Sequence, residues 1–288
     1  SGSWDEAGEG IEAMSWRLYS KIFRIAILTI AVIALIYLVL PTFVIVPLSF
    51  SSTTYLSFPP PDWSGKWYVK LWATDAYFKA FFNTLKVGIP AALIAVTLGT
   101  LAALAIVRGR LRAARPISAL IIAPLMLPQI ILAIGLFPVL ATFGLIGSYL
   151  GVILGHAVVC TPLVFITVSA ALRGYDSSFE LAAMTLGANW WRTFWNVTFP
   201  MIRLGMIVGG IFAFAFSFDE IIIALFLTDA ETFTLPKQLY DELRYQMEPT
   251  IAAASSFVLT ISFLLLGSVA VIQRLGARRQ QALTMARK

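Results

Sequence analysis

Six apolar runs dominate the chain, and they lie at roughly 22–49, 79–107, 117–142, 147–172, 201–227 and 250–273. A helix needs about 20 apolar residues to cross the hydrocarbon core of a bilayer, and each run is long enough to do so. Only 12% of the residues are charged, whereas a soluble domain carries about 25%. The sequence therefore predicts an all-α, polytopic membrane protein with six transmembrane helices.

The positions of lysine and arginine predict how these helices are oriented, because cytoplasmic loops are enriched in both residues. If the N-terminus is cytoplasmic, 15 of the 21 lysines and arginines lie on that side. Both termini are then expected to be cytoplasmic. The same topology explains the net charge of +6 without nucleic acid, since the arginines of segment 108–115 lie directly between two spans.

A polar segment, Ser177 to Pro200, interrupts the apolar runs on the predicted cytoplasmic side. Ser177 and Glu180 have the S-x-x-E spacing of a capping box, which predicts a helix that begins near Ser178. Gly187 follows where a left-handed C-terminal cap is expected, and Pro200 suits the first turn of the next span. We expect two short helices and a bend. The alternative is an ordinary interfacial helix between two spans.

The same segment carries the pattern E-x-A-A-x-x-x-G, followed by a hydrophobic residue and x-x-Pro. Its members are Glu180, Ala182, Ala183, Gly187, Val197 and Pro200. The pattern resembles the EAA loop in the membrane subunits of type I ABC importers. In that family the loop is a cytoplasmic coupling helix that lies in a groove of the ATPase subunit, which implies that these residues, Val197 apart, serve in ATPase coupling. The chain departs from the family at Leu181, where a glutamate usually precedes the two alanines.

The fifth apolar run contains two adjacent acids, Asp219 and Glu220, in the stretch FAFAFSFDEIIIALFL. A carboxylate inside a bilayer costs a few kcal/mol and normally faces a partner or an aqueous route. Asp219 and Glu220, with the flanking Phe216 and Phe218, are therefore the candidates for the substrate pathway, in the outer half of the membrane. The alternative is structural, with either acid hydrogen-bonded to the backbone of a broken span.

The stretch SFDEIIIALFLTDAETFTLP, residues 217–236, is similar to the corresponding region of spermidine/putrescine permeases, in particular the second-permease type. The resemblance implies a polyamine solute, an external or periplasmic binding protein, ATPase subunits that bind ATP and Mg²⁺, and a second permease of different sequence. It also implies the inner membrane of a bacterial cell. Alternatives are an ABC importer of another solute (an opine, amino acid, phosphonate, iron or thiamine) and a secondary carrier.

Motifs for chemistry within this chain are missing from the sequence. It has no G-x-x-x-x-G-K-[ST] phosphate loop, no Ser-His-Asp or Cys-His pair and no cluster of metal ligands. The single Cys160 and the single His156 each lie in an apolar run, where packing is the expected role. We therefore expect no catalytic, cofactor-binding or metal-binding residues, and energy supplied by another subunit.

The loop after the first run and the proline-rich third run make further predictions. The run Pro59 to Pro61 forbids helix, and the spacing of Trp63, Trp67, Leu71 and Trp72 then predicts an amphipathic helix at the outer interface. Pro124, Pro128 and Pro138 each remove a backbone hydrogen bond, which is tolerated where a span lines the protein interior. The pairs Gly151/Gly155 and Gly205/Gly209 have the spacing of closely packed helices.

These features divide the chain into three parts. Residues 1–16 are expected to be a polar tail or a cloning remnant, residues 17–276 the permease domain with its coupling loop at 176–200, and residues 277–288 a basic cytoplasmic tail. The first apolar run is longer than the hydrophobic part of a cleavable signal peptide. We therefore expect it to remain as a span.

Overall fold

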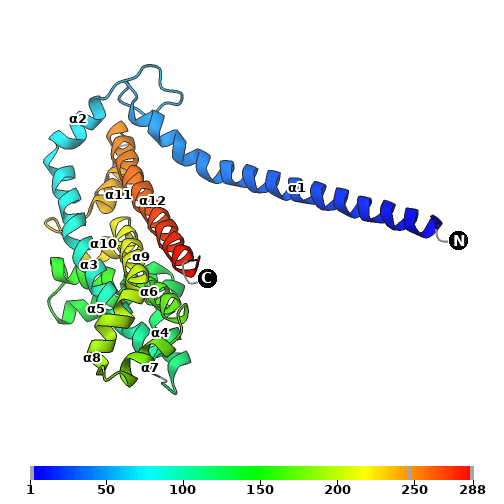
Figure 1. The fold of residues 1–288 in the computed structure, drawn as a ribbon. Helices are drawn as coiled ribbons and strands as arrows, with labels where there is room; N and C mark the ends of the chain where they lie inside the picture. Colours follow the sequence, from blue (N-terminus) through cyan, green and yellow to red (C-terminus); the bar gives the residue numbers. More distant parts are fainter. Residues whose placement is uncertain (1–2, 110, 246–247, 286–288) are drawn as a thin grey trace.

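The computed structural model describes residues 3–109, 111–245 and 248–285, and every regular element in these ranges is a helix (Figure 1). The elements are α1 (Ser3–Ser49), α2 (Lys66–Ala73), α3 (Asp75–Val107), α4 (Ala114–Met126), α5 (Gln129–Thr142), α6 (Tyr149–Arg173), α7 (Ser178–Thr185), α8 (Trp190–Thr193), the π-helix η1 (Phe194–Thr198), α9 (Phe199–Phe218), α10 (Ile222–Leu227), α11 (Leu235–Tyr245) and α12 (Pro249–Met285).

Five helical segments of the described residues are long and apolar enough to cross a membrane, and a bent pair makes a sixth if it is counted as one span. The bent pair corresponds to the third predicted run, where α4 and α5 meet at 105°. Leu127 is extended (φ −79°, ψ 142°), because the residue before a proline is driven out of the helical region. Pro128 therefore ends α4 and turns the chain.

The fifth predicted run, 201–227, is also not one helix. α9 ends at Phe218, and α10 begins at Ile222 after a break that contains Asp219 and Glu220. The Glu220 carboxylate accepts a hydrogen bond from the backbone N–H of Ile223 at 2.8 Å. An acceptor for a free N–H stabilises a new helix start, and this local capping competes with continuation of α9.

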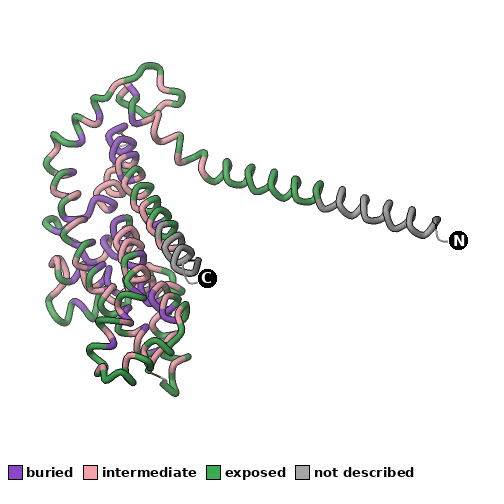
Figure 2. Tube along the Cα trace, viewed as in Figure 1, coloured by how far each residue is buried: buried purple, intermediate pink, exposed green. Residues whose placement is uncertain are grey.

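Helices α3, α6 and α9 pack together and form the centre of the molecule, where the buried residues concentrate (Figure 2). A Cβ on Gly209 would lie 2.3 Å from the hydroxyl of Thr167, and one on Gly205 would lie 2.7 Å from the Cβ of Ala171. The predicted close packing at Gly205 and Gly209 is confirmed. Gly155 is equally close to α10, since its Cβ would lie 2.6 Å from Leu227.

Helix α1 extends away from this bundle (Figure 1). Most of its apolar side chains between Ile22 and Leu40 are exposed, and it contacts α12 only near its C-terminal end, where the Ser256 hydroxyl approaches the carbonyl of Ile45 at 3.4 Å. An apolar surface of this kind needs lipid or another apolar helix around it.

The two ends of the bundle carry different elements, with α2 at one end and α7 and α8 at the other (Figure 1). The predicted helix after the first span is confirmed as α2. Trp67 and Leu71 of α2 are buried, however, and the Trp67 indole donates a hydrogen bond to the carbonyl of Ser51 at 2.6 Å. These two side chains therefore face the protein, while Trp63 and Trp72 are exposed and available to the membrane interface.

Candidate functional site

The short helix α7 ends in a backbone motif that Gly187 makes possible. Gly187 has φ +88°, its N–H donates to the carbonyl of Met184 at 3.0 Å, and the N–H of Ala188 donates to the carbonyl of Ala183 at 3.0 Å. These two bonds form a Schellman cap, which requires a left-handed residue. The predicted end of the helix at Gly187 is confirmed.

The start of α7 differs from the predicted capping box. The Ser177 side chain makes no capping hydrogen bond, and instead the carboxylate of Asp176 accepts from the backbone N–H of Ser178 at 2.9 Å. This hydrogen bond lowers the pKa of Asp176 below its usual value. Glu180 cannot complete a capping box because its carboxylate is used elsewhere.

The Glu180 carboxylate is the centre of a polar cluster beneath α7. Its Oε1 atom accepts hydrogen bonds from Arg108 Nε at 3.2 Å, from the Thr198 hydroxyl at 3.0 Å and from the Tyr175 hydroxyl. Arg108 also donates to the carbonyl of Leu172 at 2.9 Å. Burial and the hydrogen bond to Glu180 raise the pKa of Tyr175, which keeps its hydroxyl protonated as a donor.

The opposite side of α7 and the following turn form an exposed apolar surface, which we call the α7–α8 surface. Its large side chains and their exposed fractions are Leu186 (89%), Trp190 (65%), Leu181 (61%), Trp191 (60%), Phe179 (47%), Trp195 (46%) and Met184 (42%). Ala182 is exposed beside them and Ala183 is half-buried. An exposed group of large apolar side chains is typical of an interaction site.

The connection from this surface into the next span is continuous. α8 leads into η1, and η1 leads into α9, where Pro200 lies in the first turn as predicted. A π-helix inside a longer helix is rare and is frequent at functional sites. Here it contains Phe194 and Trp195, which pack with one another at a ring-centroid distance of 5.2 Å.

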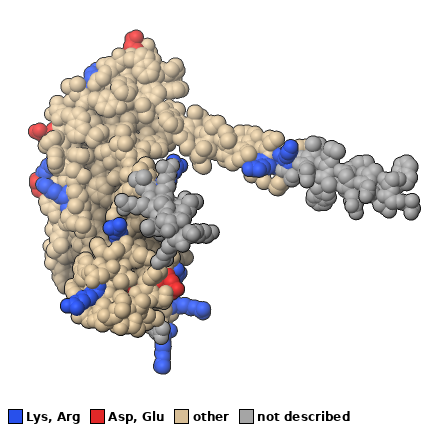
Figure 3. Space-filling model, viewed as in Figure 1, with Lys and Arg blue, Asp and Glu red and all other residues tan. Residues whose placement is uncertain are grey.

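Basic residues surround this end of the molecule, and Figure 3 shows several of the lysine and arginine side chains. Arg173 follows from the end of α6, Arg192 lies in α8 and Arg203 lies in the first turns of α9. At the opposite end three acids are paired with lysines: Glu231 with Lys79 at 2.6 Å, Asp241 with Lys237 at 3.2 Å, and Glu248 with Lys70.

A second candidate region lies at the break between α9 and α10. The side-chain amide of Gln129, the first residue of α5, donates to the Glu220 carboxylate at 3.0 Å. The α4–α5 bend and the α9–α10 break therefore lie side by side. Interrupted helices that meet inside a membrane are typical of solute sites in transporters.

The two acids of this break have different surroundings. Glu220 is buried, with 4% of its surface exposed, and both carboxylate oxygens accept hydrogen bonds, from Ile223 and Gln129. The neighbouring Asp219 is exposed, and its carboxylate has no hydrogen-bond or ion-pair partner among the described residues. The surroundings of Glu220 are therefore those of a structural residue, whereas the carboxylate of Asp219 is available to bind another group.

The two phenylalanines named from the sequence also separate. Phe218 is 1% exposed and packs in a core cluster with Leu71, Tyr77 and Leu235. Phe216 is half-buried and lies against the cluster formed by α3, α6 and α9. Phe218 is therefore occupied inside the chain, and only Phe216 retains exposed surface.

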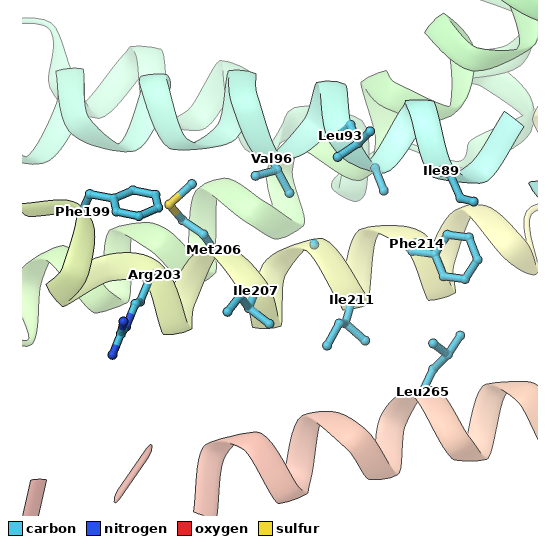
Figure 4. A pocket seen from close by; sticks show the side chains of 12 residues that line it. Ile89, Leu93, Val96, Phe199, Arg203, Met206, Ile207, Ile211, Phe214 and Leu265 are labelled. Atoms are coloured by element: carbon cyan, nitrogen blue, oxygen red, sulfur yellow. The ribbon is translucent and has the colours of Figure 1, made fainter. Parts of the chain in front are cut away.

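A separate cavity of about 570 Å³ lies between α3, α9 and α12 (Figure 4). Figure 4 shows Leu93 and Val96 of α3, Ile207 and Ile211 of α9, and Leu265 of α12 along it. Among the described residues, the one charged side chain that lines it is Arg203. An apolar groove with a cationic rim offers nothing to a cationic solute, so this cavity is not the candidate solute site.

His156 and Cys160 of α6 are fully buried, as expected for packing residues. The Nδ1 atom of His156 lies 2.7 Å from the hydroxyl of Ser217, and the Cys160 thiol donates to the carbonyl of Ala213. Both therefore link α6 to α9.

Sequence reasoning missed four residues of these two regions: Arg108, Tyr175, Thr198 and Gln129. Of these, Gln129 had the clearest signal in the sequence, because a glutamine directly after a proline inside an apolar run needs a polar partner. Arg108 was counted only as one charge of a basic turn.

Comparison with known proteins adds to this geometry. Residues 95–279 match the family described as "Binding-protein-dependent transport system inner membrane component". The putrescine transport system permease protein PotI of Escherichia coli (strain K12) is 33% identical over 239 residues, which are 81% of this chain and 85% of PotI. The spermidine/putrescine transport system permease protein PotC of the same strain is 26% identical over 241 residues, covering 83% and 90%.

Among solved structures, a bacterial ABC transporter involved in the import of the acidic polysaccharide alginate has a similar fold. The TM-score is 0.65 at 18% identity, over 88% of this chain and 96% of that chain. At this identity the similarity concerns the fold alone. The alginate transporter and this chain therefore share the helical architecture described above.

Proposed function

Because the chain belongs to the family of binding-protein-dependent transport system inner membrane components, we propose that the solute it carries is a polyamine such as putrescine or spermidine. The chain is a multi-pass permease subunit of an ABC importer and not an enzyme. The observation that carries the proposal is the 33% identity to a putrescine permease over 81% of the chain.

Asp219 supports a cationic solute. Its carboxylate lies at a helix break within the span and has no partner among the described residues. Such a group is costly in a membrane unless a cation compensates it. A primary alkylammonium group is a cation with three N–H donors. A polyamine carries at least two such groups, so Asp219 can bind one of them while the other end of the solute is not bound to it.

Energy for transport comes from ATPase subunits that bind ATP and Mg²⁺ and dock on the α7–α8 surface. We place this end of the bundle in the cytoplasm, together with both termini, because Arg108, Arg112, Arg115, Arg173 and Arg192 gather there. Closure of two ATPase subunits would displace α7 and switch the opening of a central pathway between the two sides of the membrane.

An external binding protein delivers the solute to the opposite end, near α2 and α11. The second permease of the complex differs in sequence, as the resemblance to the second-permease type implies. The exposed apolar face of α1 is compatible with a partner helix in the membrane as well as with lipid.

Competition for uptake tests the choice of solute. Cells that lack their own polyamine importers and express the complete transporter should take up labelled putrescine. An excess of unlabelled spermidine should compete, and an excess of an amino acid, a phosphonate or molybdate should not. Absence of putrescine uptake, together with uptake of one of those other solutes in labelled form, would overturn the polyamine assignment and leave an ABC importer of a different solute.

A further inference from the structure

The side chain of Glu180 points toward the membrane-spanning bundle. Its side chain is 14% exposed, whereas the next residue, Leu181, is 61% exposed. A residue in this position cannot reach a protein that docks on the α7–α8 surface without leaving its present partners. Its role must therefore be sought inside the chain.

The donors that bind Glu180 come from the ends of three different helices. Arg108 directly follows α3, Tyr175 lies two residues after α6, and Thr198 is the last residue of η1, from which α9 continues. All three donate to the same carboxylate oxygen. These are also the helices that form the packed centre of the molecule.

The cluster is closed by contacts that do not involve Glu180. The guanidinium of Arg108 lies 4.6 Å from the ring centroid of Tyr175 and donates to the carbonyl of Leu172 at 2.9 Å. Charge-assisted hydrogen bonds are stronger and more directional than neutral ones, and the pair is largely shielded from water, with Arg108 23% exposed. Glu180 is therefore held at a defined position relative to all three helices.

We propose that Glu180 is a positioning residue that fixes the coupling helix α7 to the ends of α3, α6 and α9, so that displacement of α7 moves these three helices together. This inference rests on the proposed docking of an ATPase subunit on the α7–α8 surface. α9 leads directly from this cluster to the break at Asp219. The cluster thus joins the ATPase side of the protein to the candidate solute site through one rigid helix.

The test uses the complete complex, with its ATPase subunits, second permease and binding protein, purified and reconstituted into liposomes. Two quantities are measured: the amount of ATPase that copurifies, and the number of solute molecules imported per ATP hydrolysed. The variants are Glu180→Ala and Glu180→Gln, and Asp176→Asn is the matched control, because it neutralises a nearby exposed acid that is hydrogen-bonded to Ser178 and not to Arg108, Tyr175 or Thr198.

Glu180→Ala should bind the ATPase within twofold of the wild type while the solute imported per ATP falls at least tenfold. Glu180→Gln should give a smaller fall, since its amide oxygen still accepts from Tyr175 and Thr198. Asp176→Asn should match the wild type. A merely structural role would lower the amount of assembled complex and leave the ratio of solute to ATP unchanged.

Two outcomes overturn the inference. Either Glu180→Ala loses the ATPase as completely as Leu186→Asp does, which would make Glu180 a docking residue, or it imports as much solute per ATP as the wild type. If Glu180→Ala does not assemble, Tyr175→Phe and Thr198→Val decide, because each removes one donor and should lower the same ratio. Retention of the ATPase by Leu186→Asp would instead contradict the docking surface itself.

Discussion

Arg108 and Glu180 are 72 residues apart in the sequence, yet the Arg108 Nε atom lies 3.2 Å from the Glu180 Oε1 atom. The contact joins the end of α3 to the first turn of α7. It gives the coupling helix two distinct sides, with Glu180 bound to the bundle and an apolar surface directed outward. A helix with this division can receive a force on one side and transmit it on the other.

The first prediction concerns the α7–α8 surface. Leu186→Asp should reduce the binding of the ATPase subunit on the order of tenfold, because a charge placed at the centre of an apolar interface must be desolvated. Copurification of the ATPase with the tagged permease measures the effect. Leu56→Asp, the same change at an exposed leucine in the loop before α2, should leave ATPase binding unchanged, and equal losses in both variants would contradict the assignment.

The second prediction isolates the backbone of Gly187. Gly187→Ala should destabilise the end of α7 by about 1–2 kcal/mol, because an L-residue pays that cost in the left-handed region. A Cβ there meets no atom within 4 Å, so crowding plays no part. Gly135→Ala is the control, since its Cβ also meets nothing within 4 Å but its helical backbone suits alanine. ATPase activity in the presence of the loaded binding protein should fall only in the first variant.

The third prediction concerns the unpartnered acid at the helix break. Asp219→Asn should lower polyamine uptake about tenfold at low solute concentration, because hydrogen bonds to a charged group are worth about 1.5–3 kcal/mol. The thermal stability of the complex should not fall, since the carboxylate has no partner among the described residues. Asp62→Asn, the same change at an exposed acid of the loop before α2, is the control. Normal uptake by Asp219→Asn would remove this acid from the solute pathway.

The fourth prediction separates Glu220 from its neighbour. Glu220→Ala leaves the Ile223 N–H and the Gln129 amide without their acceptor, and a buried donor without a partner costs about 1–3 kcal/mol. The melting temperature of the purified complex should therefore fall, in contrast to Asp219→Asn. A stable Glu220→Ala complex with lost uptake would reverse the two roles.

Much of the fold could be predicted from the sequence because membrane helices are encoded locally. The length of an apolar run, the position of Gly187 after a helical pattern and the placement of Pro200 each depend on residues within a few turns. The permease resemblance, drawn from the spacing of Glu180, Ala182 and Gly187, agrees with the family match.

The helix breaks show where local reasoning was insufficient. Three prolines in the third run predicted weak points, but only Pro128 produced the 105° bend, while α4 and α5 continue through Pro124 and Pro138. Which proline bends a helix depends on the groups that satisfy the freed backbone. Likewise, the partnership of Glu220 with Gln129 joins residues 91 positions apart, and only the packed structure shows it.

The polar cluster around Glu180 could not be predicted from the sequence for the same reason. Ser177 and Glu180 had the spacing of a capping box, but Arg108, Tyr175 and Thr198 offered the carboxylate stronger partners than one backbone N–H. Tertiary contacts overrode a local pattern. The acid of the coupling pattern is therefore bonded within the permease body, and small and apolar side chains are left exposed on α7 and α8.

The central claim is that this chain transports its solute with energy received from an ATPase at α7. The most direct measurement is putrescine uptake into liposomes that contain the complete complex and enclose ATP. The account predicts uptake that requires ATP and loaded binding protein, stops with vanadate and is lost in Leu186→Asp. Uptake by the purified chain alone, driven by a proton or sodium gradient and indifferent to ATP, would contradict it.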